Sequence, residues 1–433
     1  MTLMKEAKLG KTTREMLTVA KKEEIEVEVI KRRIASGKIV IVKNVGRECE
    51  LVGIGKGLTT KVNANIGTSS EHCNLDFELE KARTAVKYGA DTLMDLSTAG
   101  DLDQIRNIIL SEVKIPVGTV PIYQAAVEAV KKHGAIVDMT EDEILGVIEK
   151  HAKDGVDFMT IHAGITKEIV KRLVKISRVT GIVSRGGVFL ASWILKNQKE
   201  NPLNKNFDYI LEIAKKYDFC ISLGDALRPG SLADASDWFQ FQELLNVQKL
   251  VEKCWESNVQ VMVEGPGHLP LNHVETNVVL EKALCKEAPF YVLGPVITDI
   301  GAGYDHIVGA IGGAIAALAG ADFLCYVTPS EHLGIPTVED VKEGVVAAKI
   351  AAHCADIVKL GWKKAKIDFE MAKARAELNW EKQYKLSIDP EKAKEVRERI
   401  KPRTEACTMC GEYCVFKILS YLKKKNVFEM ENE

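Results

Sequence analysis

The sequence is poor in several features that would assign a protein quickly to a class. Its 433 residues hold only ten cysteines, too few for a disulfide scaffold, and a net charge of −2 provides no basic excess to neutralise phosphates. The most apolar stretch, Ile307–Ala321, is too short to span a membrane. We therefore expect neither nucleic acid nor a membrane as a partner.

Other familiar signals are also missing. No apolar targeting segment follows the charged amino terminus, and most cysteines stand singly in apolar runs, as buried thiols of a reducing compartment do. We expect a cytoplasmic protein. No dinucleotide-binding fingerprint occurs: residues 53–57 (GIGKG) are rich in glycine but lack the third spacing and a following helix, so we interpret them as a loop.

From about residue 61, short β-branched runs alternate with longer helical segments, which is typical of βαβ units around a parallel sheet. The runs lie at residues 61–66, 92–96, 116–121, 157–162, 182–184, 219–223, 259–264, 291–293 and 323–327. This number favours a (β/α)8 barrel, with one run too many. We predict an α/β fold with an N-terminal α+β region (1–60), a barrel (61–360) and a C-terminal helical, cysteine-bearing region (361–433).

Polar and glycine residues cluster where these runs end. The loops after the strands of a (β/α)8 barrel carry its chemistry, so the agreement across many segments predicts an enzyme. The segments are Asn63–Gly67, Met94–Ser97, Gly118–Gln124, Thr160–Gly164, Ser184–Gly187, Gly224–Ser231, Glu264–His268 and Thr328–His332.

Two of these segments end in histidine. His268 and His332, presented from nearby strands, would make good ligands for a divalent metal, with positions left for water or substrate. Glu264 or Glu331 would then orient the imidazoles. The alternative is a pair of hydrogen-bonded loop histidines.

Three further features suit an anionic substrate. The glycine-rich turn at Ser184–Gly187 exposes backbone N–H groups near a helix start, which favours a phosphate. Arg228 adds a bidentate donor, or else pairs with Asp225. His162 closes a predicted strand, so it either points into the mouth of the barrel or is a core histidine.

The most informative motif lies near the C-terminus, where Cys407, Cys410 and Cys414 form a C-x2-C-x3-C run. Three thiolates can hold three irons of a 4Fe–4S cluster and leave the fourth open for S-adenosylmethionine, where radical chemistry starts. The spacing reverses the C-x3-C-x2-C order common in radical S-adenosylmethionine enzymes. A zinc knuckle completed by a distant residue and redox-active thiols are the alternatives.

Longer blocks carry a resemblance to a known family. They are Val62–Gly67, Met94–Ser97, Gly118–Gln124, Thr160–Gly164, Val183–Gly187, Leu227–Ser231, Val263–His268, Ala288–Tyr291, Gly303–Ile307 and Cys325–Pro329. In this order they resemble the phosphomethylpyrimidine synthase family of thiamine biosynthesis. The resemblance implies a radical S-adenosylmethionine lyase that rearranges 5-aminoimidazole ribotide to 4-amino-2-methyl-5-phosphomethylpyrimidine. It also implies release of 5′-deoxyadenosine, methionine, carbon monoxide and formate.

The same resemblance implies cofactors and partners. Cys407, Cys410 and Cys414 would ligate the 4Fe–4S cluster, and His268 and His332 would bind zinc near S-adenosylmethionine. An external donor would supply electrons, and a homodimer would bring the cluster-bearing tail of one chain to the active site of the other. The residues expected at the substrate are Asn65, Met94, Tyr123, His162, Ser184, Arg185, Gly186, Asp225, Arg228, Glu264 and Tyr291.

The chain departs from the family pattern in places. The second cysteine spacing is x3 where longer relatives have x4, and Ala226 replaces an expected glycine. The nearest rival function is that of 5-hydroxybenzimidazole synthase, which uses the same ribotide for the lower base of cobalamin. A cluster- or zinc-binding sensor, and a metal-dependent aldolase or hydrolase barrel using the two histidines, also stay open. The many polar strand ends argue against a sensor, which needs one pocket.

Overall fold

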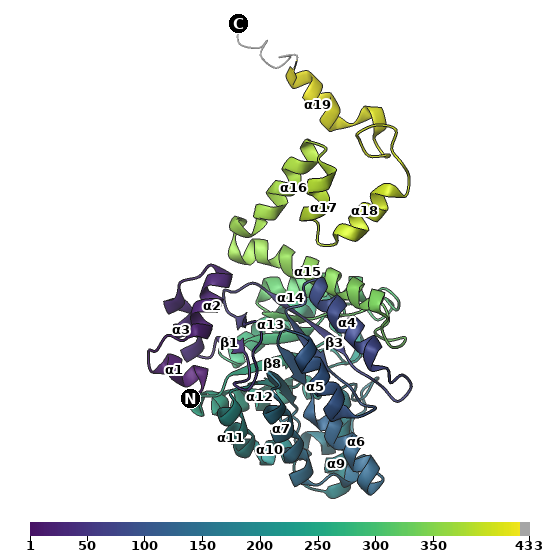
Figure 1. Ribbon diagram of the computed structural model, residues 1–433. Helices are drawn as coiled ribbons and strands as arrows, with labels where there is room; N and C mark the ends of the chain where they lie inside the picture. Colours follow the sequence, from purple (N-terminus) through teal and green to yellow (C-terminus); the bar gives the residue numbers. More distant parts are fainter. Residues whose placement is uncertain (425–433) are drawn as a thin grey trace. The chain divides into compact units, whose positions relative to one another are not determined.

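The computed structural model describes residues 1–424 (Figure 1). Residues 1–359 form one compact unit, and the described residues from 360 onward form a second. The first unit contains a barrel and an amino-terminal extension, and the second is helical. The last nine residues of the predicted C-terminal region, 425–433, lie outside the described residues.

Eight parallel strands close into a barrel in the order β10-β3-β4-β5-β6-β7-β8-β9, which confirms the predicted fold class. Closure is direct, because Phe323 of β10 lies opposite Lys61 of β3 on one side and Tyr291 of β9 on the other. The strands are β3 (Lys61–Ile66), β4 (Thr92–Asp95), β5 (Val117–Thr119), β6 (Phe158–Ile161), β7 (Cys220–Leu223), β8 (Val261–Gly265), β9 (Phe290–Leu293) and β10 (Phe323–Cys325).

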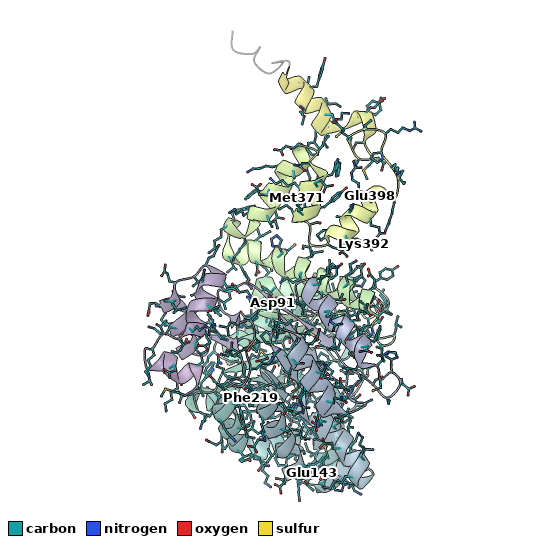
Figure 2. The ribbon with its side chains drawn as sticks, in the orientation of Figure 1. Asp91, Glu143, Phe219, Met371, Lys392 and Glu398 are labelled. Atoms are coloured by element: carbon teal, nitrogen blue, oxygen red, sulfur yellow. The ribbon has the colours of Figure 1, made fainter. Side chains whose placement is uncertain are left out.

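Helices follow every barrel strand and cover its outer face, as the alternating pattern predicts. They are α4 (Leu75–Lys87), α5 (Leu102–Glu112), α6 (Pro121–His133), η1 (Ile136–Asp138), α7 (Glu141–Asp154), α8 (Lys167–Leu173), α9 (Arg185–Asn197), α10 (Pro202–Lys205), α11 (Phe207–Tyr217), η2 (Leu232–Asp234), α12 (Trp238–Glu256), α13 (Leu271–Leu284), α14 (Asp305–Ala319) and α15 (Val338–Leu360). Local sequence defines their starts: Thr140 and Glu143 form a capping box at α7, and Figure 2 labels Glu143.

Two local predictions were wrong. Residues 182–184 are not a strand, because Ser184 is the N-cap of α9 and the two residues before it lead into that helix. This was the one run too many. Residues 53–57 are not all loop, since Val52–Gly55 is strand β2, which pairs antiparallel with β1 (Ile39–Val42). The backbone ladder forms there despite two glycines.

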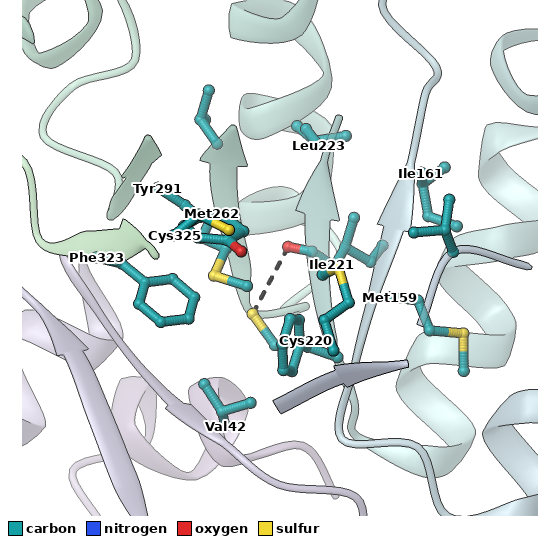
Figure 3. Close-up of a cluster of buried hydrophobic side chains, with 14 of the residues drawn as sticks. Val42, Met159, Ile161, Cys220, Ile221, Leu223, Met262, Tyr291, Phe323 and Cys325 are labelled. Carbon is teal, nitrogen blue, oxygen red and sulfur yellow. Dashed lines mark hydrogen bonds between the residues drawn. The ribbon is translucent and has the colours of Figure 1, made fainter. Parts of the chain in front are cut away.

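The hydrophobic core fills the barrel. Phe323 stacks on Tyr291 with ring centroids 4.2 Å apart, and Phe158 meets Phe323 edge-on at 6.4 Å. Gly118 leaves room for this layer, because a Cβ there would come within 2.3 Å of the Phe158 ring. Figure 3 shows part of the cluster, including Cys220.

The amino-terminal extension has a small core of its own. Helices α1 (Leu3–Lys8), α2 (Arg14–Glu23) and α3 (Val27–Ala35) pack around Met4, Met16, Ile30 and Ile34, all fully buried. Val42 of β1 instead belongs to the barrel cluster. The boundary predicted at residue 60 stays a prediction.

A buried ion pair joins this extension to the amino-terminal end of the barrel. The Arg47 guanidinium pairs with Asp157, which directly precedes β6, and also donates to the carbonyl groups of Leu110, Val113 and Ile115. With Arg47 contributing these bonds, the carboxylate is not left as an isolated buried charge. The carboxyl ends of the strands remain free to form a site.

The second unit consists of short helices connected by polar contacts. They are η3 (Trp362–Ala365), α16 (Lys366–Ala376), α17 (Trp380–Leu386), α18 (Pro390–Glu398), η4 (Gly411–Tyr413) and α19 (Val415–Lys424). The indole N–H of Trp380 donates to the Glu405 carbonyl at 2.8 Å, and Arg397 lies 3.8 Å above the Trp380 ring. These contacts hold the segment that leads to the cysteines.

Candidate functional site

A cavity of about 90 Å³ opens at the carboxyl ends of the barrel strands. It is lined by Asn65, Met94, Leu96, Val120, Tyr123, Thr160, His162, Asp225, Arg228, Glu264, Gly265, Tyr291, Val292, Leu293 and Cys325. Most of the residues predicted at the substrate thus meet in one cavity. Ser184, Arg185 and Gly186 are not in its lining and lie beside it. Their roles stay predictions.

Glu264 of β8 lines this cavity. Its Oε1 accepts hydrogen bonds from Thr160 of β6 at 2.6 Å and from Ser222 of the adjacent strand β7 at 2.7 Å. Burial raises the pKa of Glu264, and these two donors oppose that rise. Glu264 therefore combines an acidic group with a fixed orientation.

An amide and thiol network lies beside Glu264, on strands β9, β10 and β3. The Asn63 side chain donates to the Tyr291 hydroxyl at 2.8 Å, and the Asn65 side chain lies 3.1 Å from the Cys325 thiol. Burial raises the pKa of Tyr291 well above its ordinary value, so this hydroxyl stays protonated. Sequence reasoning placed Cys325 among the buried thiols and in the block Cys325–Pro329, but not at the substrate. The run predicted at residues 323–327 ends as a strand at Cys325, and this places the thiol in the cavity lining.

Asp225 and Arg228 come from one turn after β7. The guanidinium lies 3.1 Å from Asp225 Oδ1, so the predicted pairing exists, yet both side chains also line the cavity. Burial raises the pKa of Asp225 to about 7, against the lowering effect of Arg228. Asp225 Oδ2 has no hydrogen-bond partner among the described residues. The pair thus has acceptor and donor capacity left for a ligand.

His162 lies in the cavity wall, which is the first of the two alternatives that the sequence left open. Its Nε2 is 3.2 Å from Ser184 Oγ, and Nδ1 is buried without a partner in the described chain. Burial, together with the positive charge of Arg228, lowers the pKa of His162 to about 3. Gly186 has to be glycine here, because a Cβ would approach the imidazole to 2.5 Å.

The turn at which the sequence predicts anion binding lies at the amino terminus of α9. Ser184 caps it by accepting a hydrogen bond from the Gly187 amide at 3.2 Å. Arg185 places its guanidinium 5.1 Å from the Tyr123 ring centroid, within cation–π range. Unpaired N–H groups of a helix start favour negative charge, and these lie beside the cavity wall formed by His162.

His268 and His332 approach each other through their ring nitrogens, with the two Nε2 atoms 3.3 Å apart. Two nitrogens bound at about 2.0–2.1 Å to one tetrahedral zinc ion are about 3.3 Å apart, so the pair fits such an ion. The described residues contain no group of three or more metal-ligating side chains. A metal held here would keep coordination positions for other ligands.

The carboxylates that orient these imidazoles are not those named from the sequence. Asp299 lies 2.8 Å from His268 Nδ1, and Asp305 lies 3.2 Å from His332 Nδ1. Neither Glu264 nor Glu331 makes this contact. A carboxylate on Nδ1 leaves Nε2 as the ligating atom, which is the usual arrangement around a metal-bound histidine.

The cysteine run lies in the second unit, around η4. Hydrogen bonds from the backbone N–H groups of Cys410 and Met409 lower the pKa of the Cys407 thiol, whereas its neighbour Cys407 raises the pKa of Cys410. Cys414 is buried just before α19. All ten cysteines of the chain are free thiols.

Comparison with known proteins assigns the chain to a family. The profile of the Radical SAM ThiC family matches residues 2–421. The chain belongs to the Radical SAM ThiC family.

Relatives named phosphomethylpyrimidine synthase match along nearly their full length. That of Methanocaldococcus jannaschii is 56% identical over 429 residues, covering 98% of this chain and 100% of the relative. Those of Pyrococcus furiosus and Caldanaerobacter subterraneus are 55% and 57% identical, each covering 97% of this chain and 98% of the relative. Among solved structures, a dihydropteroate synthase from Coxiella burnetii covers 71% of this chain and 96% of its own, with 12% identity and a TM-score of 0.42.

Membership of the Radical SAM ThiC family identifies the chain as an enzyme and implies S-adenosylmethionine and an iron–sulfur cluster. Of the three cysteines in the run, Cys407 has backbone donors that favour the thiolate form, which is the form that ligates iron. Within residues 1–424 no helix is long and apolar enough to cross a membrane.

Proposed function

We propose that this chain is a phosphomethylpyrimidine synthase that converts 5-aminoimidazole ribotide to 4-amino-2-methyl-5-phosphomethylpyrimidine for thiamine synthesis. The observation that carries the proposal is the composition of the cavity. One wall bears a cation, Arg228, beside the α9 amino terminus, and the other bears neutral hydrogen-bonding groups such as Tyr291. Relatives at 53–57% identity named for this activity support it.

The chain's own residues would bind and orient the ribotide. Arg228 and the backbone N–H groups of Arg185 and Gly186 suit the phosphate, because both favour negative charge. The carboxylates of Asp225 and Glu264 suit ribose hydroxyls and the amino group. Neutral His162 would donate or accept a single hydrogen bond at Nδ1.

Cys407, Cys410 and Cys414 would hold a 4Fe–4S cluster. When bound with S-adenosylmethionine and an external electron donor, it supplies one-electron cleavage chemistry, with 5′-deoxyadenosine, methionine, carbon monoxide and formate as released products. The buried side chains of Tyr291 and Cys325 would help to exclude water from reactive species. Free thiols throughout the chain suit a reducing, cytoplasmic setting.

His268 and His332 would bind zinc through Nε2. Three observations support this: the spacing of the two nitrogens, and the carboxylates of Asp299 and Asp305 on the two Nδ1 atoms. Zinc would serve to bind S-adenosylmethionine near the cluster. Asp305 is itself almost fully buried, so its charge favours a cation nearby.

We further propose a homodimer. Helix α14 carries an exposed apolar stripe at helical spacing, formed by Ile307, Ile311 and Leu318, each about half exposed. Such a stripe is what an interface between two copies would bury. In a dimer, the cysteine-bearing unit of one chain would serve the barrel of its partner.

The test is product identity. The protein is reconstituted anaerobically with iron and sulfide and supplied with 5-aminoimidazole ribotide, S-adenosylmethionine and dithionite, and products are analysed by mass spectrometry. We expect the phosphomethylpyrimidine together with 5′-deoxyadenosine. Hydroxybenzimidazole in its place would assign the cobalamin branch. No 5′-deoxyadenosine from protein with an intact cluster would reject the proposal.

A further inference from the structure

A buried glutamate outside the cavity supports the turn that carries Asp225 and Arg228. The Arg228 N–H bonds to the Asp225 carbonyl at 3.2 Å, which closes a four-residue turn after β7. Glu243 of α12 accepts hydrogen bonds from the two amides in the middle of that turn, Ala226 at 3.0 Å and Leu227 at 2.7 Å. Only 3% of Glu243 is exposed.

The same carboxylate side chain also packs against the loop after β6. A Cβ on Gly164 would come within 2.9 Å of Glu243 Cγ, so only glycine allows this approach. On its other side the turn meets the start of α9, where a Cβ on Gly187 would lie 2.4 Å from the Ala226 carbonyl oxygen. The turn is therefore held between α12 and the predicted phosphate-binding segment.

Packing against Gly164 does not by itself require an acidic side chain at position 243. Leucine or methionine would fill similar space in an apolar setting, whereas a buried carboxylate is costly unless it is hydrogen-bonded. Here both oxygens are satisfied by consecutive amides, and nothing else in the described chain fills that role for Ala226 and Leu227. Burial raises the pKa of Glu243 to about 8, and the hydrogen bonds from these two amides oppose that rise. The pairing of one carboxyl group with two adjacent N–H groups defines the conformation of the turn.

We propose that Glu243 is a positioning residue for the substrate site, whose carboxylate holds residues 225–228 in the conformation that presents Asp225 and Arg228 to the ribotide. This inference rests on the proposed function, because that function identifies the ribotide as the substrate that Asp225 and Arg228 contact. Glu243 does not line the main cavity, so its effect passes through the backbone of the turn.

The test uses Glu243→Gln, which keeps size and burial but replaces one acceptor oxygen with an N–H₂ group. One of the two amides then loses its partner. By isothermal titration calorimetry of the full chain with 5-aminoimidazole ribotide, we expect Kd to rise about tenfold, equivalent to about 1.4 kcal/mol. In the reconstituted enzyme, KM for the ribotide should rise by a similar factor while kcat stays within about twofold.

Glu281→Gln is the matched control. Glu281 is also a fully buried glutamate, but it lies on α13, and neither of its carboxylate oxygens has a hydrogen-bond partner in the described chain. It should change thermal stability and leave Kd within twofold of wild type. A Glu243→Gln protein that melts lower yet binds the ribotide as tightly as wild type would overturn the proposal, because the role would then be structural only.

Hydrogen–deuterium exchange of the wild-type protein tests the two hydrogen bonds to Glu243 without any variant. The amides of Ala226 and Leu227 should exchange slowly, over an hour or longer, in the absence of ligand. Exchange within seconds would overturn the positioning role of Glu243 even if Glu243→Gln failed to fold. Failure of the wild type to bind the ribotide would instead overturn the proposed function, and this inference with it.

Discussion

At the scale of single residues, burial decides the charge state of the site. The pKa of His162 is lowered to about 3 and that of Asp225 is raised to about 7, in each case chiefly by loss of water. Neutral imidazole is thus the form of His162 throughout the physiological range. The positive charge available to a phosphate comes from Arg228 and from backbone N–H groups, which cannot lose a proton there.

Glu281 provides a prediction about stability and pH. Burial raises its pKa from 4.5 to about 8, and Lys282 only partly offsets this. The folded protein binds the proton of Glu281 more tightly than the unfolded chain does. The contribution of this proton to the free energy of unfolding is therefore full below about pH 4.5 and is lost as the pH rises through 8. We expect Glu281→Gln to raise the free energy of unfolding at pH 8.5 by about 1–3 kcal/mol.

Urea denaturation followed by circular dichroism at pH 5 and pH 8.5 measures this. At pH 5 the variant and the wild type should differ by less than about 1 kcal/mol, since glutamic acid and glutamine are then both neutral. Equal effects of the substitution at the two pH values would show that Glu281 keeps the same charge across the range.

At the scale of elements, the start of α9 links two predicted binding loops. Gly187 lies against the Ala226 carbonyl, and Ser184 caps the helix while meeting His162. The close approach explains why two glycines follow Arg185. Helix α9, the β6 loop and the β7 turn therefore form one packed group at the site.

We predict that Gly187→Ala weakens ribotide binding at least tenfold. The added Cβ would come 2.4 Å from a backbone oxygen, so either α9 or the β7 turn must shift. Gly146→Ala is the control, since Gly146 lies inside α7 with nothing within 4 Å and should gain about 0.5–1 kcal/mol of stability. Calorimetric titration and thermal melting of both variants check this. Unchanged binding by Gly187→Ala would show that the helix start has no part in the site.

The barrel was predictable because most of its strands are short, buried β-branched runs separated by amphipathic helices. Residues 182–184 looked like another strand by composition, and only the capping role of Ser184 distinguishes them. Val52–Gly55 was missed because glycine signals a loop, whereas pairing with β1 overrides that preference.

The site residues that lie at the ends of strands were predictable from the sequence. Contacts between residues far apart in the sequence were not. Asn65, Tyr123 and Glu264 come together because barrel closure brings all strand ends to one face. The contact of Asp299 with His268 joins residues 31 positions apart, and no spacing rule marks it. The role of Glu243 was likewise not predictable from the sequence, because its hydrogen-bond partners are backbone amides.

At the scale of the whole molecule, the proposed reaction needs parts of both units. The cavity belongs to residues 1–359, and the three cysteines belong to the unit that starts at residue 360. Cys410 and its neighbours have no role in the barrel fold, so a cysteine variant should separate radical chemistry from substrate binding.

The decisive measurement is 5′-deoxyadenosine formed from S-adenosylmethionine by anaerobically reconstituted protein, with and without 5-aminoimidazole ribotide, for wild type and Cys410→Ala. We expect ribotide-dependent 5′-deoxyadenosine from the wild type. We expect none from Cys410→Ala, although that variant should still bind the ribotide. Equal 5′-deoxyadenosine from both proteins, or none from wild type with a verified four-iron cluster, would contradict the proposed reaction.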